Sequence, residues 1–308
     1  MFENSKSYKR PQQQPQRRQK SGSHLERLIA ETLAIEEEAA QEAGALGYIA
    51  RALVQATMPH KRTEATFFQR TNGNFRLVMS ANTEVGLPFG TIPRLLVAWL
   101  TTEAARTKER VLVLGPSLSS FMAQLDLAPT GGRWGTITRL KDQMQRTFCA
   151  AIACLYSAEK HQAYMGFTIA DRYRLWWDTK SPEEAVAWRS EVRLGERFFE
   201  EAVHCPVPVD IRVLKALTRS PLAIDIYSWL TYRVSYLKHR TAIPWEVLQA
   251  QFGAGYPLTA LGKRNFKREF LQQLRKVHAI YHQANLEVTE DCLILLPGKP
   301  HVSRRRSQ

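Results

Sequence analysis

Apolar residues recur at helical spacing within residues 263–281, near the end of the chain. The apolar positions are Phe266, Phe270, Leu274, Val277 and Tyr281. Neighbouring members are three or four residues apart, so they form one stripe along an amphipathic helix. The far side of the same helix carries Arg264, Arg268, Gln272 and Arg275. This pattern predicts a helix that packs on a core through one face and presents cations and a carboxamide on the other.

Short apolar segments separated by turn residues predict strands. Residues 66–70 and 75–79 flank Asn72-Gly73, a pair that favours a tight hairpin turn. Further strands are expected at residues 110–114, 173–178, 191–198, 241–243, 286–289 and 292–296. Apolar periodicity and helix-starting residues predict further helices at residues 93–107, 117–127, 136–156, 209–218, 221–237 and 244–252.

The same order of elements occurs twice along the chain. Each half runs helix, short strand, helix, turn, long helix and two strands, which is the order of the winged-helix variant of the helix-turn-helix. We therefore predict a mainly α fold with small β hairpins (α+β), built as two tandem winged-helix (helix-turn-helix) domains. Pro206 and Pro208 make residues 203–209 the expected linker between them.

The predicted organisation has five parts. Residues 1–24 are rich in Gln, Lys and Arg, so a disordered basic tail is expected. Residues 25–60 combine glutamates with spaced leucines and are expected as an acidic amphipathic helix. Residues 61–204 form the first winged-helix domain, for dimerisation, DNA contact or both, and residues 205–298 form the DNA-reading second domain. Residues 299–308 are a basic C-terminal tail.

Composition points to a polyanionic partner. The 308 residues carry a formal net charge of +14 and have a sequence pI of about 9.8. Such a balance favours nucleic acid or an anionic membrane surface. No apolar stretch of about 18 residues predicts a membrane span, and the N-terminus does not have the pattern of a secretory signal. We therefore expect a cytoplasmic protein without a membrane partner.

The charged face of the helix at 263–281 predicts contact with double-stranded DNA. Arginine can donate two parallel hydrogen bonds to guanine, and glutamine can pair with adenine, whereas lysine more often contacts phosphate. The expected DNA-binding residues here are Lys263, Arg264, Lys267, Arg268, Gln272 and Arg275. The first half of a reading helix usually makes the base contacts, which favours the first four cations over Arg275. The alternative is an ordinary surface helix with a solvated charged face, which is the preferred interpretation for Lys276.

The corresponding helix of the first half has a weaker cationic face. Its candidate DNA contacts are Arg139, Gln143 and Arg146, spaced i, i+4 and i+7, although Asp142 dilutes the charge. Arg133 lies in the preceding glycine-rich segment, where the backbone can approach a phosphate closely. The first half therefore either reads DNA or serves dimerisation.

Catalytic signals are poor. The chain contains neither a Walker A loop nor a His-x-His motif, and its four cysteines include no Cys-x-x-Cys pair. We expect no enzyme activity, no cofactor and no metal site.

Several segments together resemble the family of plasmid-encoded RepA-type replication initiators over about residues 65–297. The segments that carry the resemblance are Leu87-Pro88-Phe89-Gly90, Pro93-Arg94-Leu95, Thr102-Glu103-Ala104, Leu114-Gly115-Pro116-Ser117 and Pro129-Thr130-Gly131-Gly132-Arg133-Trp134-Gly135-Thr136-Ile137-Thr138-Arg139-Leu140.

This resemblance implies an initiator that acts on plasmid DNA in the bacterial cytoplasm. Such a protein binds directly repeated sites at the origin, helps to melt adjacent A·T-rich DNA and recruits the host replicative helicase and its loader. Some relatives repress their own promoter as homodimers, which links them to plasmid copy control. The alternatives are a winged-helix transcriptional repressor without initiator activity and, less favoured, a DNA-nicking replication enzyme.

Overall fold

The computed structural model describes residues 45–175, 190–253 and 255–302. Its helices are α2 (Arg51–Gln55), α3 (Thr91–Thr107), α4 (Leu118–Gln124), α5 (Thr136–Cys149), α6 (Glu196–His204), α7 (Ile211–Ala216), α8 (Pro221–Tyr236), α9 (Trp245–Phe252) and α10 (Ala260–Ile280). Its strands are β1 (Leu46–Ala50), β2 (Phe67–Asn72), β3 (Phe75–Ser80), β4 (Val111–Val113), β5 (Ala151–Ala158), β6 (His161–Thr168), β7 (Ala170–Arg174), β8 (Glu191–Leu194), β9 (Pro206–Asp210), β10 (Thr241–Pro244), β11 (Leu286–Val288) and β12 (Cys292–Leu295).

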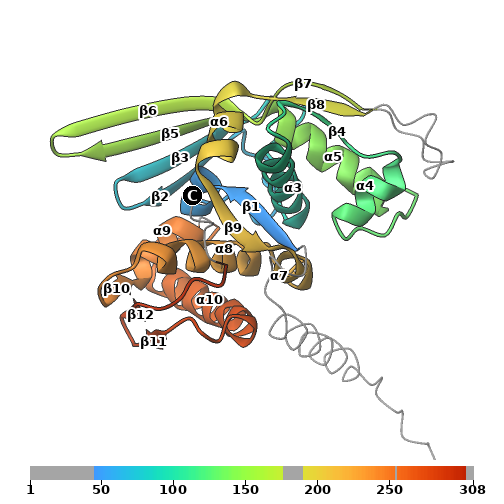
Figure 1. The fold of residues 1–308 in the computed structure, drawn as a ribbon. Coiled ribbons are helices and arrows are strands. Elements are labelled where there is room, and N and C mark those ends of the chain that lie inside the picture. The colour runs from blue at the N-terminus through green and yellow to red at the C-terminus, as the bar shows by residue number, and fades with distance from the viewer. Residues whose placement is uncertain (1–44, 176–189, 254, 303–308) are drawn as a thin grey trace, which may run out of the picture.

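The elements form two lobes that lie one above the other in Figure 1. The upper lobe holds α3, α4 and α5 and two antiparallel sheets, with strand orders β2-β3-β5-β6 and β4-β8-β7. The lower lobe holds α8, α9 and α10 and the sheet β10-β12-β11. The predicted combination of helices and antiparallel strands is thus confirmed, but the sheets are larger than the small hairpins predicted, since β2, β3, β5 and β6 form one four-stranded sheet.

One order of elements recurs in the two lobes. In the upper lobe α3, β4, α4 and α5 precede the strands β7 and β8, and β4 pairs with β8. In the lower lobe α8, β10, α9 and α10 precede β11 and β12, and β10 pairs with β12. In both lobes, therefore, the strand between the first two helices joins the last strand of the unit.

The predicted helix at residues 136–156 is wrong in its last part. The helix ends at Cys149, and the residues that follow form β5, which pairs with β3 and with the unpredicted strand β6. Ile152 and Cys154 are buried with more exposed residues between them, which is the two-residue period of a strand. A short apolar run does not distinguish helix from strand, and here the pairing partners decide.

The predicted linker and the predicted N-terminal helix are also corrected. Residues 46–50 form β1, which pairs with β9, the strand made by the expected linker. Pro206 and Pro208 fit because a two-stranded sheet has open edges, where a missing N–H group breaks no ladder. The expected strand at 191–198 ends at Leu194, and α6 begins at Glu196. The rest of the predicted helix, residues 25–44, and the predicted tail 1–24 lie outside the described residues.

The predicted C-terminal tail begins as a packed segment. His301 Nδ1 lies 2.9 Å from the hydroxyl of buried Tyr227, and its ring also packs against Tyr281. Val302 is buried as well. Residues 299–302 are therefore part of the lower lobe, and residues 303–308 lie outside the described residues.

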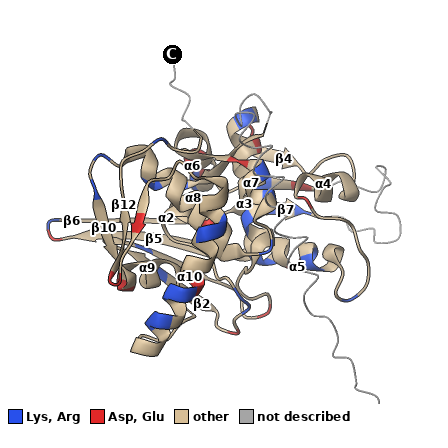
Figure 2. Cartoon of the chain, turned by 90° about the horizontal axis from the view of Figure 1, so that it is seen from below, with Lys and Arg blue, Asp and Glu red and all other residues tan. Residues whose placement is uncertain are grey.

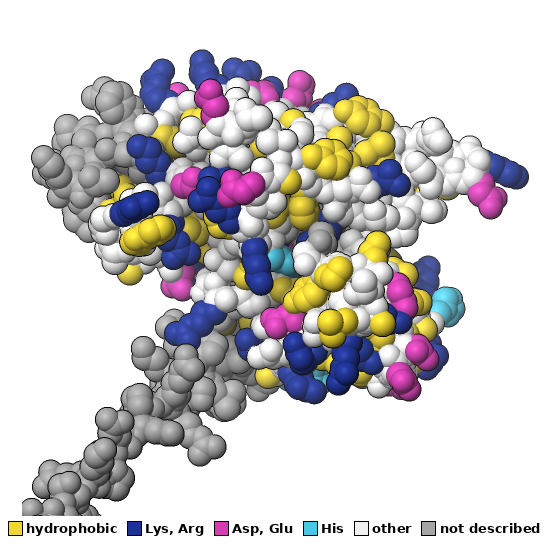
Figure 3. All heavy atoms as spheres, turned by 180° about the vertical axis from the view of Figure 1, so that it is seen from behind, with side chains coloured by type: hydrophobic (Ala, Val, Ile, Leu, Met, Phe, Trp, Pro, Cys, Tyr) yellow, Lys and Arg dark blue, Asp and Glu magenta, His cyan; other side chains and the backbone are white. Residues whose placement is uncertain are grey.

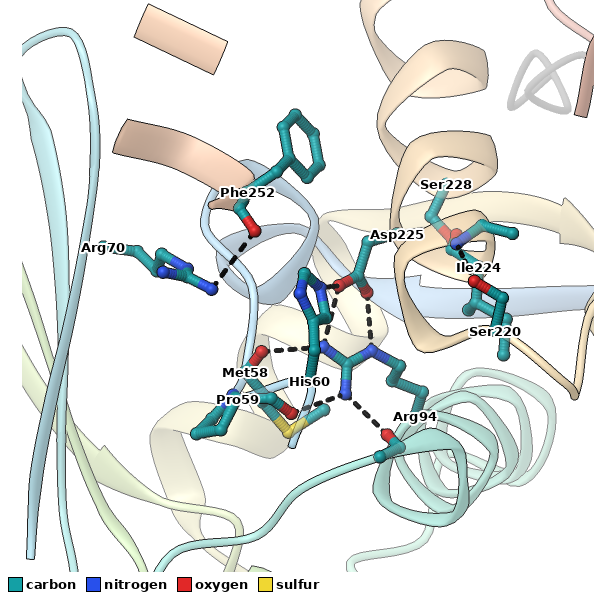
Figure 4. Close-up of polar contacts among 12 residues, drawn as sticks. Met58, Pro59, His60, Arg70, Arg94, Ser220, Ile224, Asp225, Ser228 and Phe252 are labelled. Atoms are coloured by element: carbon teal, nitrogen blue, oxygen red, sulfur yellow. Dashed lines mark hydrogen bonds and ion pairs between the residues drawn. The ribbon is translucent and has the colours of Figure 1, made fainter. Parts of the chain in front are cut away.

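A buried ion pair joins the two lobes (Figure 4). Arg94 of α3 donates to both carboxylate oxygens of Asp225 of α8, each at 2.7 Å, and also donates to the carbonyls of Met58, Pro59 and Gly90. His60 Nε2 lies 2.7 Å from Asp225 Oδ2. Burial by itself would raise the pKa of Asp225, but Arg94 and His60 hold that pKa below its usual value. The lobes are thus joined by a fully hydrogen-bonded charge pair.

Candidate nucleic-acid interface

Helix α10 begins at a well-defined cap. The hydroxyl of Thr259 accepts a hydrogen bond from the backbone N–H of Gly262 at 3.1 Å. A Cβ atom at Gly262 would lie 2.0 Å from the carbonyl oxygen of Pro257, so only glycine allows this close approach. The start of the helix is therefore set by the sequence itself.

The apolar stripe of α10 is buried, as the sequence predicted. Phe266, Phe270, Val277 and Tyr281 are fully buried and Leu274 nearly so. Trp245 and Phe252 of α9 surround Phe270, with ring centroids 5.9 and 5.5 Å away. Because aromatic packing holds the inner face, the opposite face of α10 is fixed in orientation.

The outer face of α10 carries cations that are not used by the fold. Arg264, Arg268, Gln272 and Arg275 are exposed. Within the described residues, no hydrogen bond or ion pair engages the three arginines. Figure 2 marks the basic positions along α10, and Figure 3 shows basic side chains gathered on the lower lobe. Their guanidinium groups can therefore hydrogen-bond to an external partner without breaking a contact in the protein.

The two lysines on the flank of α10 are engaged in the fold. Lys263 forms an ion pair with Glu246 of α9, and this hydrogen bond lowers the pKa of that carboxyl. Lys267 donates to the carbonyls of Thr289 and Glu290 at 3.1 and 2.6 Å. Lys267 therefore ties α10 to the turn between β11 and β12. Both lysines, which the sequence analysis gave as candidate DNA contacts, are therefore less available to an external partner than the arginines.

Helix α5 presents fewer free groups than the sequence predicted. Arg139 is exposed, but Gln143 is buried and its side-chain oxygen accepts from the N–H of Phe89 at 2.9 Å. Arg146 forms an ion pair with Asp142 and lies over the ring of Phe89. Gln143 and Arg146 are therefore structural residues, because the loop before α3 covers their side of the helix.

The glycine-rich segment before α5 is a closed turn. The N–H groups of Gly135, Thr136 and Ile137 donate to Gly132 and Thr130 of the same segment. These amides are thus already paired, which removes the expected backbone cradle for phosphate. Arg133 and Trp134 project outward, with Trp134 80% exposed.

Within the described part of the chain, no cluster of metal-ligating side chains is found. No helix there is both long and apolar enough to cross a membrane.

The sequence of the upper lobe and the start of the lower lobe decides the family. A family model described as plasmid encoded RepA protein matches residues 87–247, a little more than half of the chain. The chain belongs to this RepA family. The resemblance to RepA-type replication initiators is thereby confirmed, and the protein is a replication initiator of this type. The family match ends before α10. The choice of the α10 arginines as candidate DNA contacts therefore rests on the sequence pattern and the structure, and not on the family match.

Two crystal structures of RctB have a similar chain path. The structure of its domains 2 and 3 is 12% identical, with a TM-score of 0.50, and the match covers 82% of this RepA chain and 99% of the RctB chain. A second structure of RctB domains 2–3 is also 12% identical, with a TM-score of 0.47 and coverage of 80% and 96%. At this identity the first structure shows a shared fold only. No curated protein sequence matches the chain.

Proposed function

We propose that this RepA protein initiates plasmid replication by binding directly repeated double-stranded DNA sites at the origin through the outer face of α10. The observation that carries the proposal is the row formed by Arg264, Arg268, Gln272 and Arg275 on a helix held rigidly from behind. An α-helix fits the major groove, and a guanidinium can pair bidentately with guanine there.

We further propose that each lobe contains a winged-helix unit. The support is the element order and the pairing of the inner strand with the last strand in both lobes. In this arrangement α10 is the reading helix of the second unit, and β11 and β12 form its wing. Lys267 positions the wing by bonding to its turn.

The upper lobe has a smaller part in this proposal. Arg133 and Arg139 are exposed and supply phosphate contacts, whereas Gln143 and Arg146 are occupied within the fold. Phosphate contacts add affinity and register without reading sequence. The proposal also includes melting of neighbouring DNA and recruitment of the host helicase and its loader, and membership of the initiator family supports this part. The proposal includes no catalytic step on DNA.

Footprinting on the plasmid's own non-coding DNA tests the proposal. We expect protection of direct repeats, and a binding constant that falls with salt with a log–log slope of about −0.9 per phosphate contacted. Protection of the promoter alone, with replication unaffected by loss of the protein, would favour a repressor. A nick in supercoiled origin DNA in the presence of a divalent metal would favour a nicking enzyme.

A further inference from the structure

A basic cavity lies between the lobes, away from the row of free arginines. Its volume is about 770 Å³, and β2, α8 and α10 contribute to its walls. The basic residues that line it are His60, Lys61, Arg62, Arg70, Arg219 and Lys276. Glu269 is the one carboxylate among the lining residues that the structure describes. Figure 3 shows the hollow between the lobes, with basic and histidine side chains along it. The cavity therefore has an excess of positive charge.

Arg70 is the innermost cation and is left incompletely paired. It is 2% exposed, and its Nη2 donates to the carbonyl of Phe252 at 3.3 Å. Its guanidinium also lies over the ring of Phe68, 4.5 Å from the centroid. The buried atoms Nε and Nη1 have no hydrogen-bond partner among the described residues. Buried donors of a charged group are costly to leave without acceptors, so the site favours an added anion.

The nearby carboxylate of Asp225 compensates Arg70 only in part: it raises the pKa of the guanidinium through charge attraction, but by less than burial lowers it. Asp225 is already paired with Arg94 and His60, and Figure 4 shows Arg70 apart from that cluster, turned to Phe252. Burial lowers the pKa of Arg70 to about 9, which still leaves the guanidinium charged at neutral pH. A positive charge thus remains buried at this place without a carboxylate hydrogen-bonded to it among the described residues.

The N-terminus of α8 adds a further attraction for anions. Ser220, Pro221 and Leu222, which cap and begin this 16-residue helix, line the same cavity. The start of a helix carries a partial positive charge that attracts phosphate. Pro221 has no N–H and the N–H of Ala223 already donates to Ser220 Oγ at 3.2 Å, so the attraction here comes mainly from the helix dipole. The helix end and the incompletely paired arginine are independent observations that favour the same class of ligand.

We propose that this cavity binds the phosphate group of a small phosphorylated molecule, with Arg70 as its inner contact. A planar guanidinium suits phosphate oxygens. Lys61 and Arg219 supply further charge at the exposed rim, whereas Arg62 is paired with Glu64 at 3.1 Å. A small molecule is favoured over a DNA duplex because Arg70 is almost completely buried. Entry of the ligand requires a small movement of the lining side chains, since Nε and Nη1 are closed to solvent. The proposal does not depend on DNA reading by α10.

Thermal unfolding of the full chain tests this site. Inorganic phosphate and AMP are added separately, at an ionic strength matched with sodium chloride. Each is expected to raise the unfolding midpoint by about 2–3 °C once it exceeds its dissociation constant roughly tenfold. Arg70→Met is expected to abolish the rise while increasing the midpoint of the ligand-free protein. The matched control is Arg193→Met, an exposed arginine on β8 outside the cavity, which should keep the full rise.

Other outcomes overturn the proposal. An unchanged midpoint with both ligands, or an equal rise in Arg70→Met, would exclude the site. If neither ligand acts but Arg70→Met weakens duplex binding, the cavity holds a phosphate of the DNA backbone instead. Should Arg70→Met fail to fold, Lys276→Met and Arg219→Met replace it, each expected to weaken phosphate binding about three- to tenfold. Unchanged binding in both of these variants would also reject the assignment.

Discussion

Helices α5 and α10 occupy the same place in the order of elements of their lobes, yet they present different surfaces. On α10 the arginines of the outer face are free, and aromatic residues hold the inner face. On α5 the loop before α3 covers the C-terminal part, and Gln143 and Arg146 bond to it or lie against it. Equivalent position in a repeated fold therefore does not imply an equivalent surface. Under the proposed function, the side chains left free by the packing decide which helix can read DNA.

The largest expected effect on stability comes from breaking the buried ion pair between the two lobes that carry these helices. Asp225→Ala leaves Arg94 buried without its carboxylate, which should reduce the free energy of unfolding by about 3–5 kcal/mol. Chemical denaturation measures this loss. The control is Asp171→Ala, which removes a much more exposed ion pair with Arg110 and should cost no more than about 1 kcal/mol. Equal losses would mean that the buried pair does not hold the lobes together.

Variants of the free arginines test the comparison directly. Arg264→Ala and Arg268→Ala should each weaken binding to an origin repeat by about 1–3 kcal/mol, roughly five- to 150-fold, because a bidentate base contact is lost. Titration of labelled repeats at fixed salt measures this. Lys276→Ala serves as the control and should change affinity little. Arg146→Ala should instead lower stability, because its largely buried side chain bonds to Asp142 and packs on the ring of Phe89. A uniform loss of affinity across all four variants would indicate diffuse electrostatics.

A smaller effect is expected at the turn between β11 and β12. Lys267→Ala removes two hydrogen bonds to backbone carbonyls and should cost about 1 kcal/mol of stability. It should also loosen the turn, which amide hydrogen exchange at Glu290 and Asp291 would detect. Arg268→Ala, one residue further along α10, should leave exchange at this turn unchanged. Slow exchange retained in Lys267→Ala would show that β11 and β12 hold the turn without the lysine.

The pH dependence of stability tests whether the His60 ring is neutral where it lies between the two lobes. Burial lowers the pKa of His60, against the opposing influence of Asp225, so the folded protein favours the neutral ring. Stability is then full above the unfolded pKa, about 6.5, and declines as the pH falls below it, because the unfolded chain takes up the proton first. His60→Gln should reduce this acid-induced decline in the midpoint of unfolding between pH 7 and 5. An unchanged slope would assign the decline to other groups, such as His301, whose pKa burial also lowers.

Local patterns predicted the elements that depend on neighbours in sequence. The stripe of α10 and the hairpin of β2 and β3 were found because helical period and the Asn72-Gly73 turn are local signals. The strand β5 was misassigned because a short apolar run does not distinguish helix from strand and because its partner β3 lies far away along the chain. Nothing in the local sequence distinguishes β9 from a proline-rich linker, since its partner β1 lies far away along the chain.

For the candidate DNA contacts, too, the sequence predicted what depends on local pattern and missed what depends on distant parts of the chain. The helical period alone predicted that Arg264 and Arg268 lie opposite the apolar stripe of α10, and both are exposed in the structure. Period does not show that a distant loop covers Gln143. The sequence also gave no sign that Arg70, on a predicted hairpin strand, would be buried between the lobes. Burial of a charged residue depends on which surfaces meet, and that is a property of the assembled chain.

The pairing of β1 with β9 has a consequence for how the protein is made. The two strands are separated by about 160 residues, and loop closure over such a distance is slow. During synthesis on the ribosome, Leu46–Ala50 must wait until Asp210 has emerged before its strand partner exists. A fragment cut at residue 204 would expose this edge permanently and is expected to aggregate. The upper lobe therefore completes its fold only after the polypeptide has started the lower one.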